Sequence, residues 1–480
     1  MLNLINNIID TGNTILWSYV LIAVLIGVGL FFTLKTNFIQ FHYIGEMFKV
    51  LGGSGSKKEG GVSAFQAFCI SVASHVGTGN LAGVAIAVSV GGPGAVFWMW
   101  VIALIGAASS FIENTLAQAF KIKDKNGYRG GPAYYMEKAL GKKKMGMVFS
   151  VLITISFGLV FNSVQANTVS FAFEEAFGLS RVAVGLGLSV LTAMVIFGGV
   201  NRIARVSEIL VPVMATAYVL VALFVIAKNF TLIPGVFAMI FEGAFGVKAA
   251  AGGGIGAAMM MGIKRGLFSN EAGMGSAPNA AATSEVSHPV KQGLLQTLGV
   301  FVDTILICSC TALVVLISGA NQTEGLTGIQ LTQTALSSQV GSWANLFIAV
   351  CIMLFAFSSI IGNYYYGESN IEFLKVNKNW LQVFRISVIF MVFFGTQSAV
   401  SVVWNMADLF MGLMALMNLY AIVRLGHIAV DILADYKKQK SQGKDPVFIA
   451  SNIKGLEKAE VWTEEHADQF REKEVEPVNV

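Results

Sequence analysis

Two short glycine-rich stretches interrupt apolar segments of this 480-residue sequence. The first reads SVASHVGTGNLAGV (71–84) and the second reads GIKRGLFSNEAGMGSAPN (262–279). Unwinding a helix inside a bilayer costs several kcal/mol for each N–H or C=O group that finds no partner. A bound solute can be that partner, because freed N–H groups suit an anion and freed carbonyls suit a small hard cation such as sodium. A zwitterionic amino acid needs both kinds of group.

The overall composition is that of a membrane protein. Hydrophobic residues make up 55% of the chain and charged residues only 12%, whereas a soluble domain carries about 25% charged residues. The net charge of +4 does not indicate nucleic-acid binding, because the lysines and arginines are spread over short loops and a tail. The cysteines lie in apolar segments without metal-ligand spacing, which predicts small core residues: Cys69, Cys308, Cys310 and Cys351.

Apolar segments of about 20 residues, long enough to cross a bilayer, recur along the chain. Eleven are predicted, at 14–35, 62–90, 94–120, 145–172, 181–198, 206–227, 248–280, 295–318, 341–365, 381–397 and 402–424. A further piece at 234–246 is too short to span and is expected to lie at the interface. The predicted fold class is therefore an all-α polytopic membrane protein with 11 transmembrane helices. The charged residues beyond about 437 contain no recognisable domain.

The placement of basic residues predicts the orientation. With the N-terminus outside, all of the 32 lysines and arginines except Arg181, Lys228 and Lys248 fall on the inner side. Membrane proteins retain positive charge on the cytoplasmic side, so the N-terminus is expected outside and the C-terminus in the cytoplasm. The first basic residue, Lys35, follows the first apolar segment, which favours a retained helix over a cleaved signal peptide.

The spans can be grouped into two related halves. If the first helix is set aside, ten remain, and two sets of five are related by inverted topology because an odd number of spans reverses direction. The two glycine-rich stretches then fall on corresponding helices, as in paired discontinuous helices at a transporter's central site. Alternatively, the glycines only allow close helix packing. The predicted divisions are an N-terminal helix and basic loop (1–61), two inverted repeats (62–247 and 248–425) and a charged cytoplasmic tail (426–480).

Several long motifs resemble one family. They are GTGNLAGVA (77–85), GGPGAVFWMW (91–100), GIKRGLFSNEAGMGSAP (262–278), FVDTILIC (301–308) and VWNMAD (403–408). The chain, from about 14 to 425, resembles the alanine or glycine:cation symporters, bacterial and archaeal sodium-coupled amino-acid carriers. The resemblance implies a cell-membrane protein with the five-plus-five fold of the bacterial leucine transporter, preceded by one extra helix. It implies a neutral amino-acid substrate and sodium as coupling ion, with no other cofactor, no nucleic acid and no obligate protein partner.

The resemblance also implies which residues hold the substrate. Backbone N–H groups of the first break would bind its carboxylate, and carbonyls and side chains of the second break would face or gate its amino group. Gln165 is a further expected contact, although it could instead hydrogen-bond a neighbouring helix. The implied substrate residues are Thr78, Gly79, Asn80, Gln165, Phe268, Ser269, Asn270, Glu271 and Gly273. Asn363 is a further predicted substrate residue, for a separate reason, its departure from the family pattern.

A sodium site beside the first break is implied in the same way. Its five oxygens would be the carbonyls of Ala73, Val76 and Phe355 and the hydroxyls of Ser358 and Ser359. Five oxygen ligands suit a hard monovalent cation. Taken without the resemblance, two adjacent serines in a membrane helix more often mediate helix packing.

Asn363 departs from the family pattern. Some members have tryptophan at this point of the sequence, where this chain has Gly362-Asn363-Tyr364. An amide leaves more volume and offers a donor and an acceptor, which would match the side chain of glutamine. Alanine or glycine is the family expectation, and glutamine is a close rival. The alternative is that Asn363 pairs with a neighbouring helix away from the substrate.

Four ionisable residues are predicted at membrane depth, where each is costly unless paired or hydrated. Asp303 and Asp408 are expected to pair with hydroxyls or helix ends, and Glu113 to serve helix packing or an inner gate. His75 adjoins the first break and could titrate near neutral pH, which keeps a proton-coupled carrier open as an alternative.

Other classes of protein fit the sequence less well. A channel would need one continuous pore-lining pattern, whereas two separate helix breaks suit an occluded central site. An intramembrane aspartyl enzyme would need two carboxylates close together, and nothing in the sequence brings Asp303 and Asp408 together. Motifs for metalloprotease, serine-hydrolase or ATP-binding chemistry are not found. The sequence therefore predicts a carrier and no enzyme.

Overall fold

The structure is a computed structural model that describes residues 2–54, 62–124, 127–198, 200–246, 254–375 and 377–471. Up to residue 246 the helices are α1 (Leu2–Ile15), η1 (Leu16–Leu21), α2 (Ile22–Lys35), α3 (Ile39–His42), α4 (Ile44–Gly53), α5 (Ala64–His75), η2 (Gly79–Gly83), α6 (Val84–Gly91), α7 (Gly94–Ala119), α8 (Pro132–Lys138), α9 (Lys143–Ile155), η3 (Ser156–Phe161), α10 (Asn162–Phe177), α11 (Arg181–Ile196), α12 (Val200–Lys228), η4 (Phe230–Leu232) and α13 (Ile233–Phe245). From residue 254 they are α15 (Gly254–Asn270), α16 (Ala277–Ala281), α17 (Pro289–Val300), η5 (Phe301–Cys308), α18 (Ser309–Ser318), η6 (Ala320–Gln322), α19 (Gly328–Val340), α20 (Trp343–Phe373), α21 (Lys378–Gln397), α22 (Val400–Ser441), η7 (Ala450–Asn452) and α23 (Glu464–Arg471). Two short strands, β1 (Ile122–Asp124) and β2 (Gly127–Arg129), pair antiparallel.

The predicted class of helical membrane protein is confirmed. Within the described ranges, 7 helices are long and apolar enough to cross a membrane, or up to 9 if each of two bent pairs counts as one span. One bent pair joins α5 to the segment Gly79–Gly91 at 45°, and the other joins the end of α12 to α13 at 74°. The expected spans at 181–198 and 248–280 correspond to the shorter helices α11 and α15. The total of 11 spans stays a prediction.

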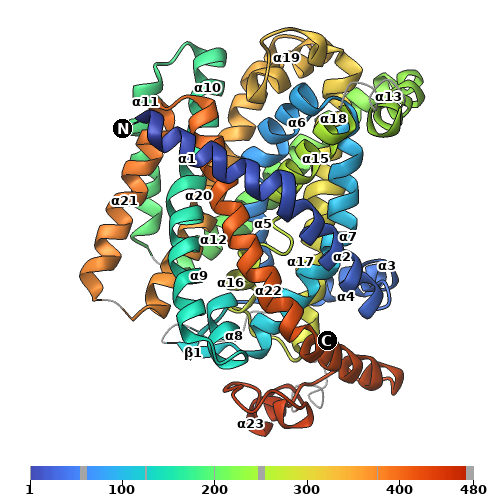
Figure 1. The fold of residues 1–480 in the computed structure, drawn as a ribbon, viewed down its shortest axis with the longest axis vertical. Coiled ribbons are helices and arrows are strands. Elements are labelled where there is room, and N and C mark those ends of the chain that lie inside the picture. The colour runs from blue at the N-terminus through green and yellow to red at the C-terminus, as the bar shows by residue number, and fades with distance from the viewer. Residues whose placement is uncertain are drawn as a thin grey trace, which may run out of the picture.

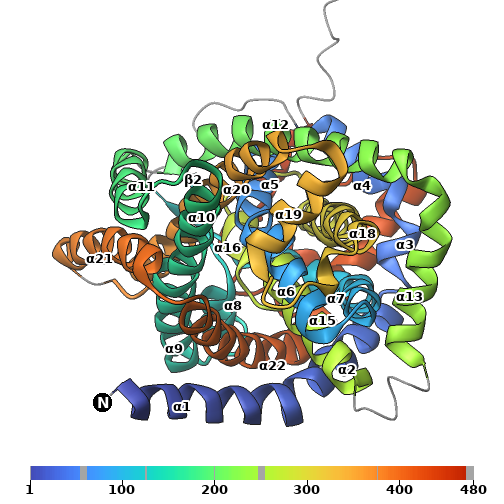
Figure 2. The ribbon, with the colours of Figure 1, turned by 90° about the horizontal axis from the view of Figure 1, so that it is seen from above.

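The broken helices lie in the middle of the bundle. Seen from above, α5, α6 and α16 are enclosed by longer helices, with α1 along one side and α12 along the opposite side (Figure 2). α7 packs against α15 and α17, and α20 packs against α5 and α10 (Figure 1). Large apolar side chains on outer helices remain exposed, such as Leu34, Val213 and Ile386. This outer apolar surface is what lipid contact requires.

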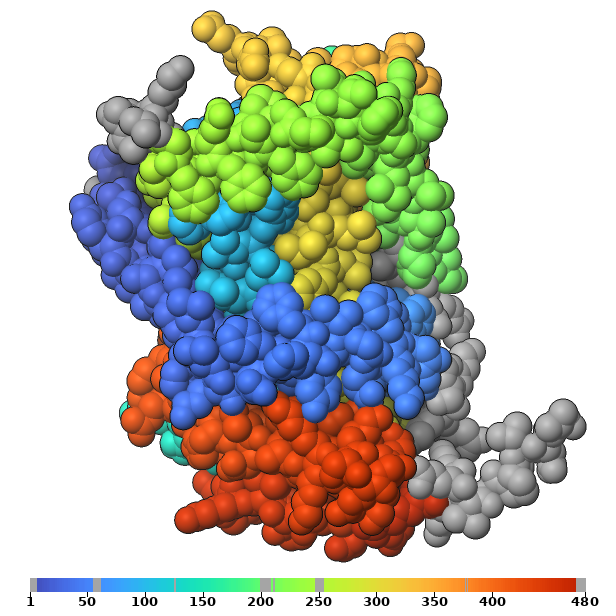
Figure 3. Space-filling model, turned by 90° about the vertical axis from the view of Figure 1, so that its right-hand side faces the viewer, coloured from blue at the N-terminus to red at the C-terminus, as the bar shows by residue number. Residues whose placement is uncertain are grey.

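One end of the molecule is covered by short elements and the C-terminal residues. α8, the β1–β2 hairpin and α23 lie at the lower end in Figure 1, whereas α19 and α13 lie at the opposite end. In space-filling view the red C-terminal residues cover that lower end (Figure 3). α22 continues unbroken through 425 to Ser441, and the residues after it pack onto the helices above.

Candidate functional site

The first predicted break is present. α5 begins with a capping box in which Ser63 and Gln66 satisfy each other's backbone N–H groups, and it ends at His75. Val76 is extended, and the chain then resumes as the π-helical turn η2. The glycines are needed for close approach, because a Cβ at Gly77 would lie 2.2 Å from Ser359 Oγ and one at Gly79 would lie 3.1 Å from Ser269 Cα.

The second predicted break follows α15. Glu271 adopts φ of 55°, and Gly273 and Gly275 adopt 84° and 87°, before the short helix α16 resumes. Left-handed backbone at three positions out of five ends any helix, and it costs a non-glycine residue such as Glu271 about 1 kcal/mol or more. Both interrupted spans expected from the sequence are therefore interrupted in the structure.

A buried carboxylate from α7 accepts hydrogen bonds from the backbone of the second break. Glu113 is fully buried; its Oε1 accepts the N–H of Gly273 at 3.0 Å, and its Oε2 accepts the N–H of Gly275 at 3.1 Å. Oε2 also accepts from the Asn418 amide at 2.6 Å. Glu113 thus takes the place of the helical carbonyls that the unwound chain lacks. Only a weak signal for this role is present in the sequence, namely a glutamate inside an apolar helix.

The two breaks meet at Asp303, in the π-helical segment η5. Asn80 Nδ2 donates to Asp303 Oδ1 at 2.6 Å, and Ser269 Oγ donates to Asp303 Oδ2 at 2.8 Å. Thr304 Oγ1 donates to the same Oδ2 at 2.7 Å. Asn80 Oδ1 in turn accepts the N–H of Gly77 at 2.8 Å. The expectation that Asp303 pairs with hydroxyls is met, and the aspartate joins one broken helix to the other.

Gln165 reaches the first break from α10. Its Oε1 accepts from the backbone N–H of Thr78 at 2.9 Å and from Thr78 Oγ1 at 2.6 Å. The predicted residues Thr78, Gly79, Asn80, Gln165 and Ser269 are therefore gathered around the two breaks. Asn270 lies beside them, where its Nδ2 donates to Thr304 Oγ1 at 3.2 Å.

A second cluster of polar side chains lies at the end of α5, directly before the first break. Ser74 Oγ lies 2.8 Å from Glu271 Oε1 and 2.7 Å from Asn363 Oδ1, and its single proton can serve only one of them at a time. His75 Nε2 lies 3.5 Å from Glu271 Oε2, and Ser276 Oγ donates to the same oxygen. Asn363 Nδ2 is buried without a hydrogen-bond partner among the described residues. An unused donor of this kind is available to a polar solute.

The five predicted sodium ligands converge. Ser359 Oγ lies 2.9 Å from the Ala73 carbonyl oxygen, 3.0 Å from that of Phe355 and 3.4 Å from that of Val76. Ser358 Oγ lies 2.8 Å from the Phe355 oxygen and 3.4 Å from the Ala73 oxygen. The Ala73 and Val76 carbonyls are at the broken end of α5, where the helix no longer uses them. An all-oxygen set of hydroxyls and carbonyls has the chemistry that suits sodium, although its role stays a prediction.

Aromatic rings and a buried ion pair lie above the second break. Phe268 packs between Phe161 and Trp404, with ring centroids 4.7 and 4.6 Å away. Arg265 stacks over the Trp404 ring and donates to both oxygens of Asp408, at 2.7 and 2.5 Å. The expectation that Asp408 pairs with hydroxyls or helix ends is therefore wrong, because its partners are cationic: Lys264 also lies 3.3 Å from it.

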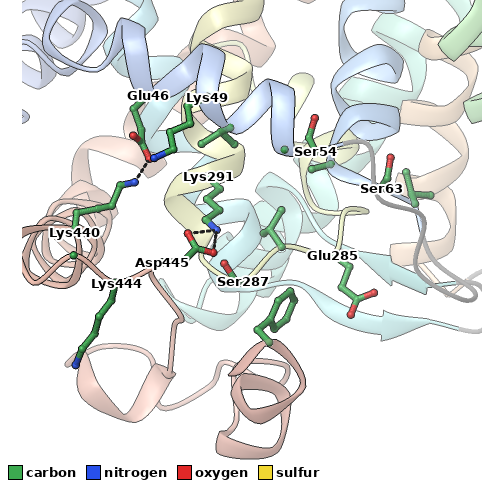
Figure 4. A pocket seen from close by; sticks show the side chains of 17 residues that line it. Glu46, Lys49, Ser54, Ser63, Glu285, Ser287, Lys291, Lys440, Lys444 and Asp445 are labelled. Atoms are coloured by element: carbon green, nitrogen blue, oxygen red, sulfur yellow. Dashed lines mark hydrogen bonds and ion pairs between the residues drawn. The ribbon is translucent and has the colours of Figure 1, made fainter. Parts of the chain in front are cut away.

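A cavity of about 910 Å³ lies elsewhere, at the end of the molecule that carries the C-terminal residues (Figure 4). α4, the loop at 285–287 and the end of α22 line it. Its charges are largely balanced, because Lys440 pairs with Glu46 and Lys291 pairs with Asp445, each at 2.7 Å. It shares no lining residue with the two breaks.

Comparison with known proteins gives consistent results. The family model described as "Sodium:alanine symporter family" matches residues 2–450. The amino-acid carrier protein AlsT of Bacillus subtilis is 55% identical over 96% of this chain and 98% of its own length. The probable sodium/glutamine symporter GlnT of the same organism is 55% identical over 96% of this chain and 97% of its own length.

Two solved transporter structures share the fold at low identity. A manganese transporter mutant of Eremococcus coleocola has a TM-score of 0.51 at 14% identity, covering 80% of this chain and 88% of its own. A sodium-coupled sialic acid symporter has a TM-score of 0.50 at 15% identity, covering 88% of this chain and 92% of its own. At this identity the likeness concerns the fold alone.

Proposed function

The chain belongs to the sodium:alanine symporter family, and on that premise we propose that it imports a neutral amino acid together with sodium across the cell membrane. The proposed architecture has 11 spans, in which α1–α2 precedes two inverted repeats of five (62–247 and 248–425). The N-terminus is outside and the C-terminal residues are cytoplasmic, as the distribution of basic residues favours. Alanine or glycine is the family's substrate, and glutamine is a close rival.

The observation that carries this proposal is the convergence of five oxygens where α5 breaks beside α20. Sodium there would hold α5 against α20 and so fix the Thr78-Gly79-Asn80 segment, whose backbone N–H groups are proposed to bind the substrate carboxylate. For Thr78 this requires the carboxylate to replace Gln165 Oε1, which accepts its N–H at 2.9 Å. Glu271 and backbone carbonyls of the second break are proposed to face or gate the substrate amino group. Sodium and substrate are coupled only if each binds more tightly in the presence of the other.

Substitution of Ser359 by alanine tests the sodium site. The variant loses one of five ligands to a charged ion, worth about 1.5–3 kcal/mol. The sodium concentration for half-maximal uptake is therefore expected to rise about 10- to 100-fold. Uptake of labelled alanine and glutamine into proteoliposomes, measured over a sodium series, gives this value.

The matched control is Ser170→Ala, a buried hydroxyl that lies 2.7 Å from the Asn167 carbonyl of its own helix and 3.3 Å from the Thr396 carbonyl of α21, and touches none of the five predicted ligands. It should keep the sodium dependence of the unaltered protein. Sodium-independent uptake by the unaltered protein would remove the coupling proposal. If that uptake instead followed an imposed pH gradient, the proton-coupled alternative would hold, with the buried His75–Glu271 pair as the proposed proton-binding site.

Asn363 is proposed to set substrate preference. Its unused Nδ2 would bind a side-chain amide, so Asn363→Trp is expected to weaken competition by glutamine at least about 10-fold while alanine and glycine still compete. Asn363→Leu, of similar size to asparagine, removes the amide without adding bulk and should give the same order of preference. Competition against labelled alanine uptake measures each. Glutamine that never competes, or that competes as well in both variants as in the unaltered protein, contradicts the role of Asn363.

A further inference from the structure

The residues after α22 fold back onto the transport helices as a C-terminal clasp, residues 444–471. Trp462 is 1% exposed, and its indole N–H donates at 2.8 Å to the carbonyl of Gln118 at the end of α7. Phe448 is fully buried against the ring of His288 and that of Trp462. The charged tail expected from the sequence therefore carries its own small apolar core.

The clasp is attached to one particular loop, 282–288. The Phe448 N–H donates to the carbonyl of Ser287 at 2.9 Å, and Ser287 Oγ donates to the carbonyl of Pro446 at 2.8 Å. Lys121, itself buried, donates to the carbonyl of Ser284 at 2.8 Å while its ammonium lies over the Trp462 ring at 4.6 Å. The clasp and the end of α7 thus hold the loop from two sides.

The 282–288 loop is joined to both broken helices. It connects α16, the half of the second broken helix nearest the clasp, to α17 (Figure 1). It also pairs with the residue that leads into α5, since Val62 and Ser284 form a parallel bridge and the N–H of Glu285 donates to the carbonyl of Val62 at 3.3 Å. α5 and α16 are therefore held through one loop to α7 and to the clasp.

We infer that the C-terminal clasp restrains opening of the pathway on its own side of the membrane. The inference rests on the proposed function, and it adds that opening to the cytoplasm moves the broken-helix halves α5 and α16 relative to α7. While Trp462 and Phe448 are docked, that movement must break the contacts at Gln118 and Ser287. A docked clasp therefore shifts the population towards the inwardly closed form, and its release shifts the population towards the inwardly open form.

Trp462 is the residue to change. The exposed ion pairs of the clasp, Lys138–Glu460 and Lys291–Asp445, join carboxylates that are 60% and 52% exposed and contribute little. The buried indole contributes packing area and a hydrogen bond together. Trp462→Ala therefore releases the clasp without touching α5, α16 or the breaks.

Cys69 on α5 reports the opening. It is 1% exposed, on the half of the first broken helix nearest the clasp. In inside-out membrane vesicles, an impermeant maleimide is expected to label Cys69 at least about 5-fold faster in Trp462→Ala than in the unaltered protein, the lower end of usual coupling. Cys69→Ser in each background identifies the labelled thiol, and Lys458→Ala, an exposed change in the clasp, should label at the unaltered rate.

A second variant and a test of correct folding distinguish release of the clasp from misfolding. Phe448→Ala should accelerate labelling in the same direction, and saturating sodium and alanine should raise the thermal unfolding temperature of each variant as they do for the unaltered protein. The inference would be overturned by variants that pass this check, whose clasp is cleaved by added protease, and whose Cys69 is still labelled at the unaltered rate. The labelling assay needs no transported substrate. An unchanged labelling rate would therefore contradict the clasp inference without affecting the sodium dependence of uptake. Sodium-independent uptake would contradict the coupling proposal without affecting the labelling result.

Discussion

Alanine in place of Glu113 is expected to abolish uptake and to destabilise the protein strongly. The N–H groups of Gly273 and Gly275 and the amide of Asn418 would lose their shared acceptor together. Each buried polar group left unpaired costs about 1–3 kcal/mol, so the three cost on the order of 3–9 kcal/mol. Uptake into proteoliposomes and thermal unfolding of the purified protein measure the two effects.

The neighbour on α7 supplies the control. Asn114 is also buried, but its amide donates to the Ser110 carbonyl of its own helix at 2.7 Å, so Asn114→Ala should retain most uptake. Glu113→Gln keeps one acceptor and places an amide N–H against a backbone N–H, which should give an intermediate loss. If Glu113→Ala transports and unfolds like the unaltered protein, the carboxylate does not complete the second break.

Removal of the Asp408 carboxylate is expected to have a comparable effect. Asp408→Ala leaves the Arg265 guanidinium, 3% exposed, without its carboxylate partner. Breaking one side of a buried ion pair costs about 3–5 kcal/mol, mainly because the other charge stays buried and unpaired. Both protein yield in the membrane and uptake should fall severely, as measured by quantitative blotting and by transport assay.

A paired substitution separates the charge from the contact. In Arg265→Gln with Asp408→Asn, two amides can keep a hydrogen bond between α15 and α22 with no buried charge at either position. The double variant should therefore accumulate far better than Asp408→Ala. Equal yield of the two variants would show that the buried unpaired charge is not what destabilises the single variant.

The class of helical membrane protein and the two helix interruptions followed from the sequence, whereas the total of 11 spans stays a prediction. Apolar runs of span length and the scarcity of basic residues on one side are local patterns, because a bilayer constrains each segment independently. Glycines at 77 and 79 and at 273 and 275 marked the breaks, since glycine best accommodates the close approaches at the first break and the left-handed backbone at the second. The predicted sodium ligands came from the family resemblance, and the structure brings them together because they lie within a few positions of one another on α5 and α20.

What fills and joins the breaks was decided by the tertiary structure. Glu113 satisfies a segment 160 residues away, Asp408 pairs with Arg265 instead of the hydroxyls expected, and Trp462 closes on Gln118 across 344 residues. The π-helical segments η2 and η5, which contain the paired residues Asn80 and Asp303, have no sequence signature either. The sequence alone determined that this chain is a helical membrane protein and where its two glycine-rich helices are interrupted, since both depend on residues a few positions apart. Only the tertiary structure decided which buried charged residue pairs with which unpaired group. Such pairs depend on proximity in space between residues that are far apart in the sequence.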